Sequence, residues 1–259
     1  MTDRIRLDGR IAVVTGAAGV IGIETMQLLA ARGACIVAVD HDAERLRRAV
    51  TGLPAHAEAL AVVADVTREE DVAGYVAHAL AKFSRIDVFF NNAGIEGDIA
   101  PIVRSSVENF RRVLEVNVVG VFLGMKHVLP VMLKQNNGSI INTASIAGVI
   151  GSADIAAYSA SKHAVIGLTK TAAQECTGTP VRVNCICPGM IDSRMLSAIV
   201  VGRNKGQTVA PEKVVDRIPA RRLGLAAEVA PIVAFLASDD ASYVSGSAYT
   251  VDGGRTSSS

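Results

Sequence analysis

The chain has 259 residues, half of them apolar, and a formal net charge of +1. A chain of this size buries about three-quarters of the surface that it exposes when unfolded, so we expect one large domain over residues 1–259. The near-zero charge, without a long basic run, argues against nucleic-acid binding. The absence of ~18 uninterrupted apolar residues and of an apolar signal segment argues against a membrane protein and favours a cytoplasmic one.

Seven apolar runs of strand length alternate with helical patterns along the chain. They are Ile11–Thr15, Ala34–Asp40, Ala59–Ala64, Val88–Asn91, Ser139–Thr143, Val181–Cys187 and Ala248–Val251. Because the runs are apolar throughout rather than at every second residue, we expect strands that are buried on both faces. Right-handed βαβ units then predict an α/β protein with a Rossmann-type, doubly wound, seven-stranded parallel sheet. Ligands bind such sheets at the carboxyl ends of the strands.

The first strand is followed by a turn that contains Gly16, Gly19 and Gly22. Such a turn between a strand and a helix lets backbone amides and the positive helix end hold a pyrophosphate. Asp40, at the end of the second strand, can accept hydrogen bonds from both ribose hydroxyls and would repel a 2′-phosphate, which predicts NAD rather than NADP. A strand-end aspartate is otherwise often a helix cap, a role that Asp42 can fill instead.

Tyr158 and Lys162 are four residues apart in a helical pattern and so lie on one helix face. We expect the lysine to lower the pKa of the phenol, which is normally ~10. Ser145, in a turn upstream, can hydrogen-bond the oxygen that gains or loses charge. Together they predict interconversion of an alcohol and a ketone, with Tyr158 moving the proton. Tyr-x-x-x-Lys alone more often marks a half-buried aromatic beside a lysine, so the assignment of a catalytic site depends on the other motifs.

These motifs, together with Asn91-Asn92-Ala93-Gly94, follow one another in an order that resembles the single-domain subgroup of the short-chain dehydrogenase/reductase family, from about Gly9 to Gly254. The middle glycine departs from that subgroup, which usually has it where this chain has Val20, and the spacing resembles the extended subgroup instead. The resemblance implies that Tyr158 and Lys162 also contact the cofactor. Further cofactor contacts that we expect are Ile21, Asp65, Val66, Asn92, Gly94, Ile191 and Ser193.

Asn117 interrupts an apolar helical pattern with an amide that needs hydrogen-bond partners. By resemblance it is the fourth catalytic residue, which holds a water that links Lys162 to solvent. The alternative is a structural amide at a helix kink. Asp65 likewise has a structural alternative, as the cap of the next helix.

Residues 193–219 carry only short helical patterns between glycines and prolines, which predicts a substrate lid or, alternatively, an ordinary surface connection. The residues that we expect around the reacting carbon are uncharged, and they predict a hydrophobic, cyclic or aryl secondary alcohol or ketone. They are Ser145, Ile146, Ala147, Ile155, Met190, Met195 and Leu196. One alternative is a 3-oxoacyl-carrier-protein reductase, which is typically NADP-dependent. A non-catalytic dinucleotide sensor is another, and a sugar-nucleotide epimerase would need a further substrate domain.

Cys185 and Cys187 lie in a strand-like run, where we expect their side chains on opposite faces and therefore no metal site. We interpret the four cysteines as core thiols rather than a disulfide framework. The Ser-rich end, 256–259, is predicted to be disordered. The apolar helical patterns 103–133 and 155–176 resemble the family's subunit interfaces and predict a homotetramer.

Overall fold

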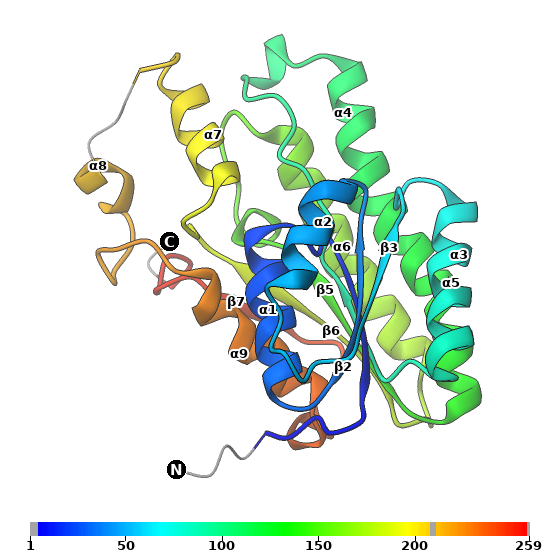
Figure 1. Cartoon of the computed structure of the whole chain (residues 1–259). Coiled ribbons are helices and arrows are strands. Elements are labelled where there is room, and N and C mark those ends of the chain that lie inside the picture. Colours follow the sequence, from blue (N-terminus) through cyan, green and yellow to red (C-terminus); the bar gives the residue numbers. More distant parts are fainter. Residues whose placement is uncertain (1–4, 208–210, 258–259) are drawn as a thin grey trace.

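The computed structural model describes residues 5–207 and 211–257, which build a seven-stranded parallel sheet in the order β3-β2-β1-β4-β5-β6-β7 (Figure 1). Each predicted strand is confirmed to within one residue at either end. The observed strands are β1 Ile11–Thr15, β2 Cys35–Asp40, β3 Ala59–Val63, β4 Val88–Asn91, β5 Gly138–Thr143, β6 Val181–Pro188 and β7 Ala248–Val251. The strands β1 to β3 are added toward one edge of the sheet and β4 to β7 toward the other. The order therefore reverses between β1 and β4, which is where doubly wound sheets bind their ligands.

Helices cover both faces of the sheet (Figure 1). They are α1 Val20–Ala31, α2 Ala43–Thr51, α3 Glu69–Phe83, α4 Val107–Leu114, α5 Gly120–Gln135, α6 Ala156–Glu175, α7 Arg194–Arg203, α8 Pro211–Val215 and α9 Ala226–Ala237. One apolar core joins the sheet to α1, α2 and α9, and the other joins it to α3, α5 and α6. Consecutive strand residues pack alternately in the two cores. In β1, Ala12 and Val14 pack in the core with α1, α2 and α9, whereas Val13 packs in the core with α3, α5 and α6.

One run in the described residues, Val107–Gln135, is long and apolar enough to cross a membrane by length and composition alone. It comprises α4, a π-helical turn at Glu115–Val119 and α5. This run packs against β4 and β5 of the sheet and against α3 and α6, which is how a core helix is placed.

Two expectations about the chain differ from the structure. Cys185 and Cys187 both point into the core beneath α6, because residues two apart in a strand share a face, so the expected opposite placement was wrong. They remain buried free thiols, and no group of metal-binding side chains occurs in the described residues. Thr256 is also ordered rather than disordered, since its amide and hydroxyl both donate to the Asp252 carboxylate. Residues 258–259 of the predicted tail lie outside the described residues.

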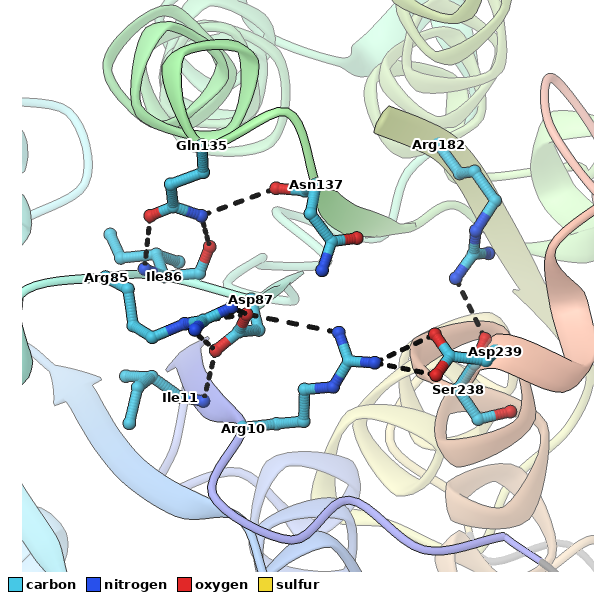
Figure 2. A network of polar contacts seen from close by, with 10 residues as sticks. All are labelled: Arg10, Ile11, Arg85, Ile86, Asp87, Gln135, Asn137, Arg182, Ser238 and Asp239. Carbon is cyan, nitrogen blue, oxygen red and sulfur yellow. Dashed lines mark hydrogen bonds and ion pairs between the residues drawn. The ribbon is translucent and has the colours of Figure 1, made fainter. Parts of the chain in front are cut away.

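The amino ends of the strands are joined by a polar network, at the edge opposite the expected site (Figure 2). The Asp87 carboxylate is 1 % exposed and accepts hydrogen bonds from the amide of Ile11 at 2.9 Å and from Arg85. Arg10 pairs with Asp239 at 2.8 Å. Arg182 donates to the carbonyl of Leu236 in the last turn of α9 and to that of Ser238, which follows the helix. These contacts hold the strand starts in register and leave the opposite edge for ligands.

Candidate active site

The glycine turn after β1 leads directly into α1, whose first turn has no capping side chain and no acidic residue. Gly16 has φ +62°, and a Cβ there would lie 2.9 Å from the backbone of Ala93. A Cβ on Gly22 would lie 2.3 Å from the Gly16 carbonyl oxygen. Only glycines therefore let the turn and helix approach this closely, and the uncapped helix end suits a pyrophosphate. Gly19 precedes the first helical residue, so the shift of the middle glycine leaves a regular start to α1.

Asp40 lies beside this turn and is 9 % exposed. One carboxylate oxygen accepts from the Ala18 amide at 3.0 Å, and the other accepts from the Asp42 amide at 3.1 Å. Arg45 donates to the Ala18 carbonyl at 2.9 Å, so the Ala18 peptide is held on both sides. Asp42 is the N-cap of α2, as predicted. Asp40 therefore supports the glycine turn and keeps further acceptor sites on its carboxylate.

The amide of Asn92 braces the ends of three strands rather than pointing freely into a pocket. It donates to the carbonyls of Thr15 and Gly16, both at 3.2 Å, and accepts from the Thr143 hydroxyl at 3.1 Å. Gly94 lies at the centre of the site, since a Cβ there would lie 3.4 Å from the ammonium of Lys162. The structure thus brings the predicted Asn92 and Gly94 together and gives Asn92 a structural role as well.

Asp65 and Val66 follow β3. One Asp65 carboxylate oxygen accepts from the amide and hydroxyl of Thr67 at 2.9 and 2.8 Å. Burial opposes ionisation of Asp65, but these hydrogen bonds outweigh it and lower its pKa. The N-cap of α3 is Arg68, so Asp65 does not cap that helix and its second oxygen is available for a ligand. Val66 packs on Gly120 at the start of α5.

Tyr158 and Lys162 come from α6 and lie beside Ser145, which follows β5. The phenol is 8 % exposed and the lysine 2 %. The Lys162 ammonium lies 5.5 Å from the Tyr158 ring centre and donates to the Thr143 carbonyl at 2.7 Å. The Ser145 hydroxyl lies close enough to the phenol to oppose the rise of its pKa, and it accepts from the Ala147 amide at 3.1 Å. The three predicted side chains therefore converge at the carboxyl end of β5.

The electrostatics of this pair differ from our expectation. Burial raises the pKa of Tyr158 to about 12, and the Ser145 hydrogen bond opposes this rise only in part. Burial also lowers the pKa of Lys162 to about 8. The expectation that the lysine lowers the pKa of the phenol was wrong for this structure, because the same burial disfavours both charged forms.

Asn117 lies in the π-helical turn between α4 and α5 and is fully buried. Its side-chain oxygen accepts from the Ile95 amide at 2.8 Å, while its nitrogen donates to the Ile95 carbonyl at 2.9 Å and to the Ser161 hydroxyl at 3.0 Å. The amide therefore fixes the loop after β4 against α6. Any water that Asn117 holds would use its main-chain carbonyl or the remaining lone pair of its side-chain oxygen.

An apolar cluster packs on Tyr158 from the substrate side. Of the predicted residues it contains Ala147, Ile155 and Met195, and it adds Ile99 and Ile199, which we did not predict. Ile199 is four residues after Met195, so helical periodicity in α7 would have found it. Met190 instead lines a separate hollow with Ile191, Gly224 and Asp252. Ile146 and Leu196 are partly buried and lie outside the cluster.

The segment 193–219 begins with an ordered helix over this cluster. The Ser193 hydroxyl caps α7 by accepting from the Leu196 amide at 3.2 Å, and it donates to the Ile191 carbonyl at 3.1 Å. Ile191 forms an isolated parallel bridge with Gly224. Residues 208–210 of the predicted lid lie outside the described residues.

A charged residue that sequence reasoning missed also faces the site. Glu96, in the loop after β4, is 8 % exposed and raises the pKa of Tyr158 through its charge. Its position in the sequence, two residues after Gly94 in a strand-end motif, was the available signal.

Comparison with known proteins is consistent with this geometry. Residues 16–256 match the family model described as "Enoyl-(Acyl carrier protein) reductase". The chain is 40 % identical to 3-oxoacyl-[acyl-carrier-protein] reductase FabG of Thermotoga maritima over 96 % of this chain and 99 % of that protein. It is 39 % identical to cyclohexanol dehydrogenase of an Acinetobacter species over 97 % of each.

The crystal structure of NAD+-bound xylitol dehydrogenase superposes on this fold with a TM-score of 0.90 at 38 % identity. The match covers 96 % of this chain and 99 % of that one. The overall fold described above is therefore shared with a structure that holds NAD+.

Proposed function

The chain belongs to the short-chain dehydrogenase/reductase family, and we propose that it is an NAD-dependent oxidoreductase that interconverts a hydrophobic, cyclic or aryl secondary alcohol and its ketone. The observation that carries the proposal is the convergence of Ser145, Tyr158 and Lys162 beneath an apolar wall. The cyclohexanol dehydrogenase among its relatives supports a cyclic substrate.

In ketone reduction, Tyr158 donates its proton to the oxygen that becomes the alcohol. Its raised pKa keeps the phenol protonated at neutral pH, which is the form that this direction needs. Ser145 hydrogen-bonds the same oxygen and holds it beside the phenol. Lys162, anchored on Thr143, would orient the ribose of the cofactor, and Asn117 would connect the lysine to water. In alcohol oxidation the proton moves the other way.

The cofactor residues fit a dinucleotide without a 2′-phosphate. The uncapped start of α1 would hold the pyrophosphate, and the Asp40 carboxylate would accept from the ribose hydroxyls. Ile21 and Gly22 lie in the first turn of α1, Asp65 and Val66 would flank the adenine, and Ile191 and Ser193 would meet the carboxamide. Bound NAD would accept the hydride from the carbinol carbon or, reduced, return it. The NAD+-bound xylitol dehydrogenase supports this choice of cofactor.

A second candidate is reduction of a 3-oxoacyl carrier protein. The identity to FabG of Thermotoga maritima and the description of the matching family favour it. Asp40 argues against it if that reaction uses NADP, because the carboxylate occupies the place of a 2′-phosphate. A non-catalytic dinucleotide sensor is less consistent with the chain, since all four catalytic positions are filled.

The test measures reduced-nicotinamide absorbance with NAD or NADP and a panel of cyclic, aryl and acyl substrates. We expect NAD-linked turnover of a hydrophobic alcohol, and loss of nearly all turnover in Tyr158→Phe. Tyr249→Phe on β7 is the matched control, which should keep full activity. Unchanged turnover in Tyr158→Phe would rule out the proposed mechanism, and NADP-only turnover of acyl substrates would favour the second candidate.

We also propose a cytoplasmic homotetramer. Apolar side chains on α4 and α5 are exposed, among them Val107, Phe110, Phe122 and Leu133, at 57, 38, 48 and 41 %. Such a patch on a soluble protein is a common sign of a subunit interface. Light scattering tests the state: a mass near four chains supports the proposal, and a monomer contradicts it.

A further inference from the structure

Two arginines hold α7 across the active site, one at each end of the helix. At its start, Arg194 makes a two-point ion pair with Glu96, with nitrogen–oxygen distances of 2.6 and 3.0 Å. At its end, Arg203 donates to the Ser152 hydroxyl at 2.8 Å and to the Ala153 carbonyl at 2.7 Å. Between them Ile199 packs on Tyr158. The position of α7 over the phenol therefore depends on polar contacts at both ends.

The two ends differ in what they hold. Arg203 contacts neutral partners, whereas Arg194 pairs with a carboxylate that lies on the active-site side. The Glu96 side chain is 10 % exposed and that of Arg194 is 72 % exposed. A buried carboxylate that loses its ion-pair partner destabilises the fold, and its charge acts strongly on neighbours in a low dielectric. Movement of α7 away from the site would separate these two charges.

We propose that Glu96 and Arg194 are positioning residues of this reaction: their ion pair holds α7 over Tyr158 and offsets the carboxylate charge that Tyr158 would otherwise face. The inference rests on the proposed function and deepens it. The ion pair therefore couples two properties of the site: the position of α7 over Tyr158 and the proton affinity of Tyr158. Both residues act through α7 and Tyr158 and not by contact with the reacting atoms.

The groups that face Tyr158 come from four elements. Lys162 lies on its own helix, Ser145 follows β5, Glu96 follows β4, and Cys187 lies in β6. The hydrogen bond with Cys185 and burial raise the pKa of Cys187, so this thiol stays neutral. Glu96 is therefore the one negative charge among these four groups, and it raises the pKa of Tyr158. Removing Arg194 should increase its effect, and removing Glu96 should abolish it.

The first measurement is the pH dependence of kcat/KM for alcohol oxidation, which requires the ionised phenol. In Arg194→Met we expect the limb assigned to Tyr158 to move up by roughly half to one pH unit, and in Glu96→Gln to move down by a similar amount. The double variant should resemble Glu96→Gln, because the arginine has lost its partner. KM should rise roughly fivefold in Arg194→Met. Movement of both single variants in one direction, or of neither, would contradict the proposal.

The second measurement is hydrogen exchange of the α7 amides, which needs no turnover. We expect faster exchange in Arg194→Met and in Arg203→Met. Only Arg194→Met should also move the limb of the kcat/KM pH profile that is assigned to Tyr158. Arg194→Lys keeps the charge and loses the two-point geometry, so exchange should rise while the limb stays in place. Arg48→Met, which breaks an exposed pair with Glu44 on α2, is the control.

The two measurements separate the possible failures. If exchange is faster in Arg194→Met but the parent protein turns over no alcohol, the ion pair does hold α7 and the proposed function is refuted instead. Unchanged α7 exchange in Arg194→Met, with an active enzyme, would overturn the positioning role while the proposed function stands. Should Arg194→Met fail to fold, Arg194→Lys and Glu96→Gln carry the same comparison.

Discussion

Asp40 should contribute to cofactor use in two separable ways, because its carboxylate faces the expected ribose and also accepts from the amide of Ala18. Asp40→Asn removes the charge but keeps a side-chain oxygen for that amide. Asp40→Ala removes both. The pair of variants therefore separates recognition of the ribose from support of the glycine turn.

The magnitudes follow from the contacts. A hydrogen bond to a charged group contributes about 1.5–3 kcal/mol, so loss of the charge should lower kcat/KM with NAD by roughly 10- to 100-fold in both variants. A buried amide without an acceptor costs about 1–3 kcal/mol. Asp40→Ala should therefore lose a further factor of about 5 or more with NAD and with NADP alike, and its unfolding midpoint should fall below that of Asp40→Asn.

The assay is steady-state kinetics of both variants with NAD and with NADP, accompanied by urea unfolding without cofactor. Use of NADP should improve relative to NAD in both variants, because the repulsion of a 2′-phosphate is gone. Equal kinetics and equal stability of the two variants would refute the supporting role of Asp40. Unchanged NAD kinetics in both would refute its contact with the ribose.

Two further predictions concern stability. Asp87→Ala should lower the free energy of unfolding by about 1–3 kcal/mol, because it leaves the buried Ile11 amide without its acceptor, while the two arginines that lose the same carboxylate are partly exposed (Figure 2); urea unfolding checks this, and a change below about 0.5 kcal/mol would contradict it. Lys162→Met should stabilise the cofactor-free protein by about 3 kcal/mol at pH 7, since burial lowers the folded pKa to about 8 from an unfolded value of 10.5. The unfolded state then binds more protons between these pH values, so stability of the parent should rise from pH 8 to 10 whereas the variant should lack this rise; parallel pH profiles of the two proteins would refute the assignment.

Much of the fold could be predicted from the sequence because each strand is a continuous apolar run between glycine- or polar-rich turns. The positions of the site residues followed from the same strand assignments, since Asp40 ends β2, Asn92 directly follows β4 and Ser145 lies two residues after β5. The face shared by Cys185 and Cys187 was also available from strand periodicity, and our expectation misapplied it.

Other features could not be predicted because they depend on contacts between distant segments. The raised pKa of Tyr158 arises from packing by α7, which begins 36 residues later, and from Glu96, which lies 62 residues earlier. The brace that Asn92 forms between the ends of β1 and β5 has the same origin. Local patterns identify which residues lie at a strand end, but not which of their polar atoms are already engaged.

Counting polar atoms separates ligand contacts from supports among the residues that the sequence selected. A carboxylate offers about four acceptor sites, and Asp40 uses two of them for backbone amides while the His41 imidazole lies 3.2 Å from one oxygen, so it can support the glycine turn and still receive a ribose. The amide of Asn92 uses both donors and one acceptor, which leaves a single acceptor site for any ligand. We therefore expect Asn92 to support cofactor binding chiefly by holding the turn that Asp40 also holds, and Asp40 to make the direct contact that we propose.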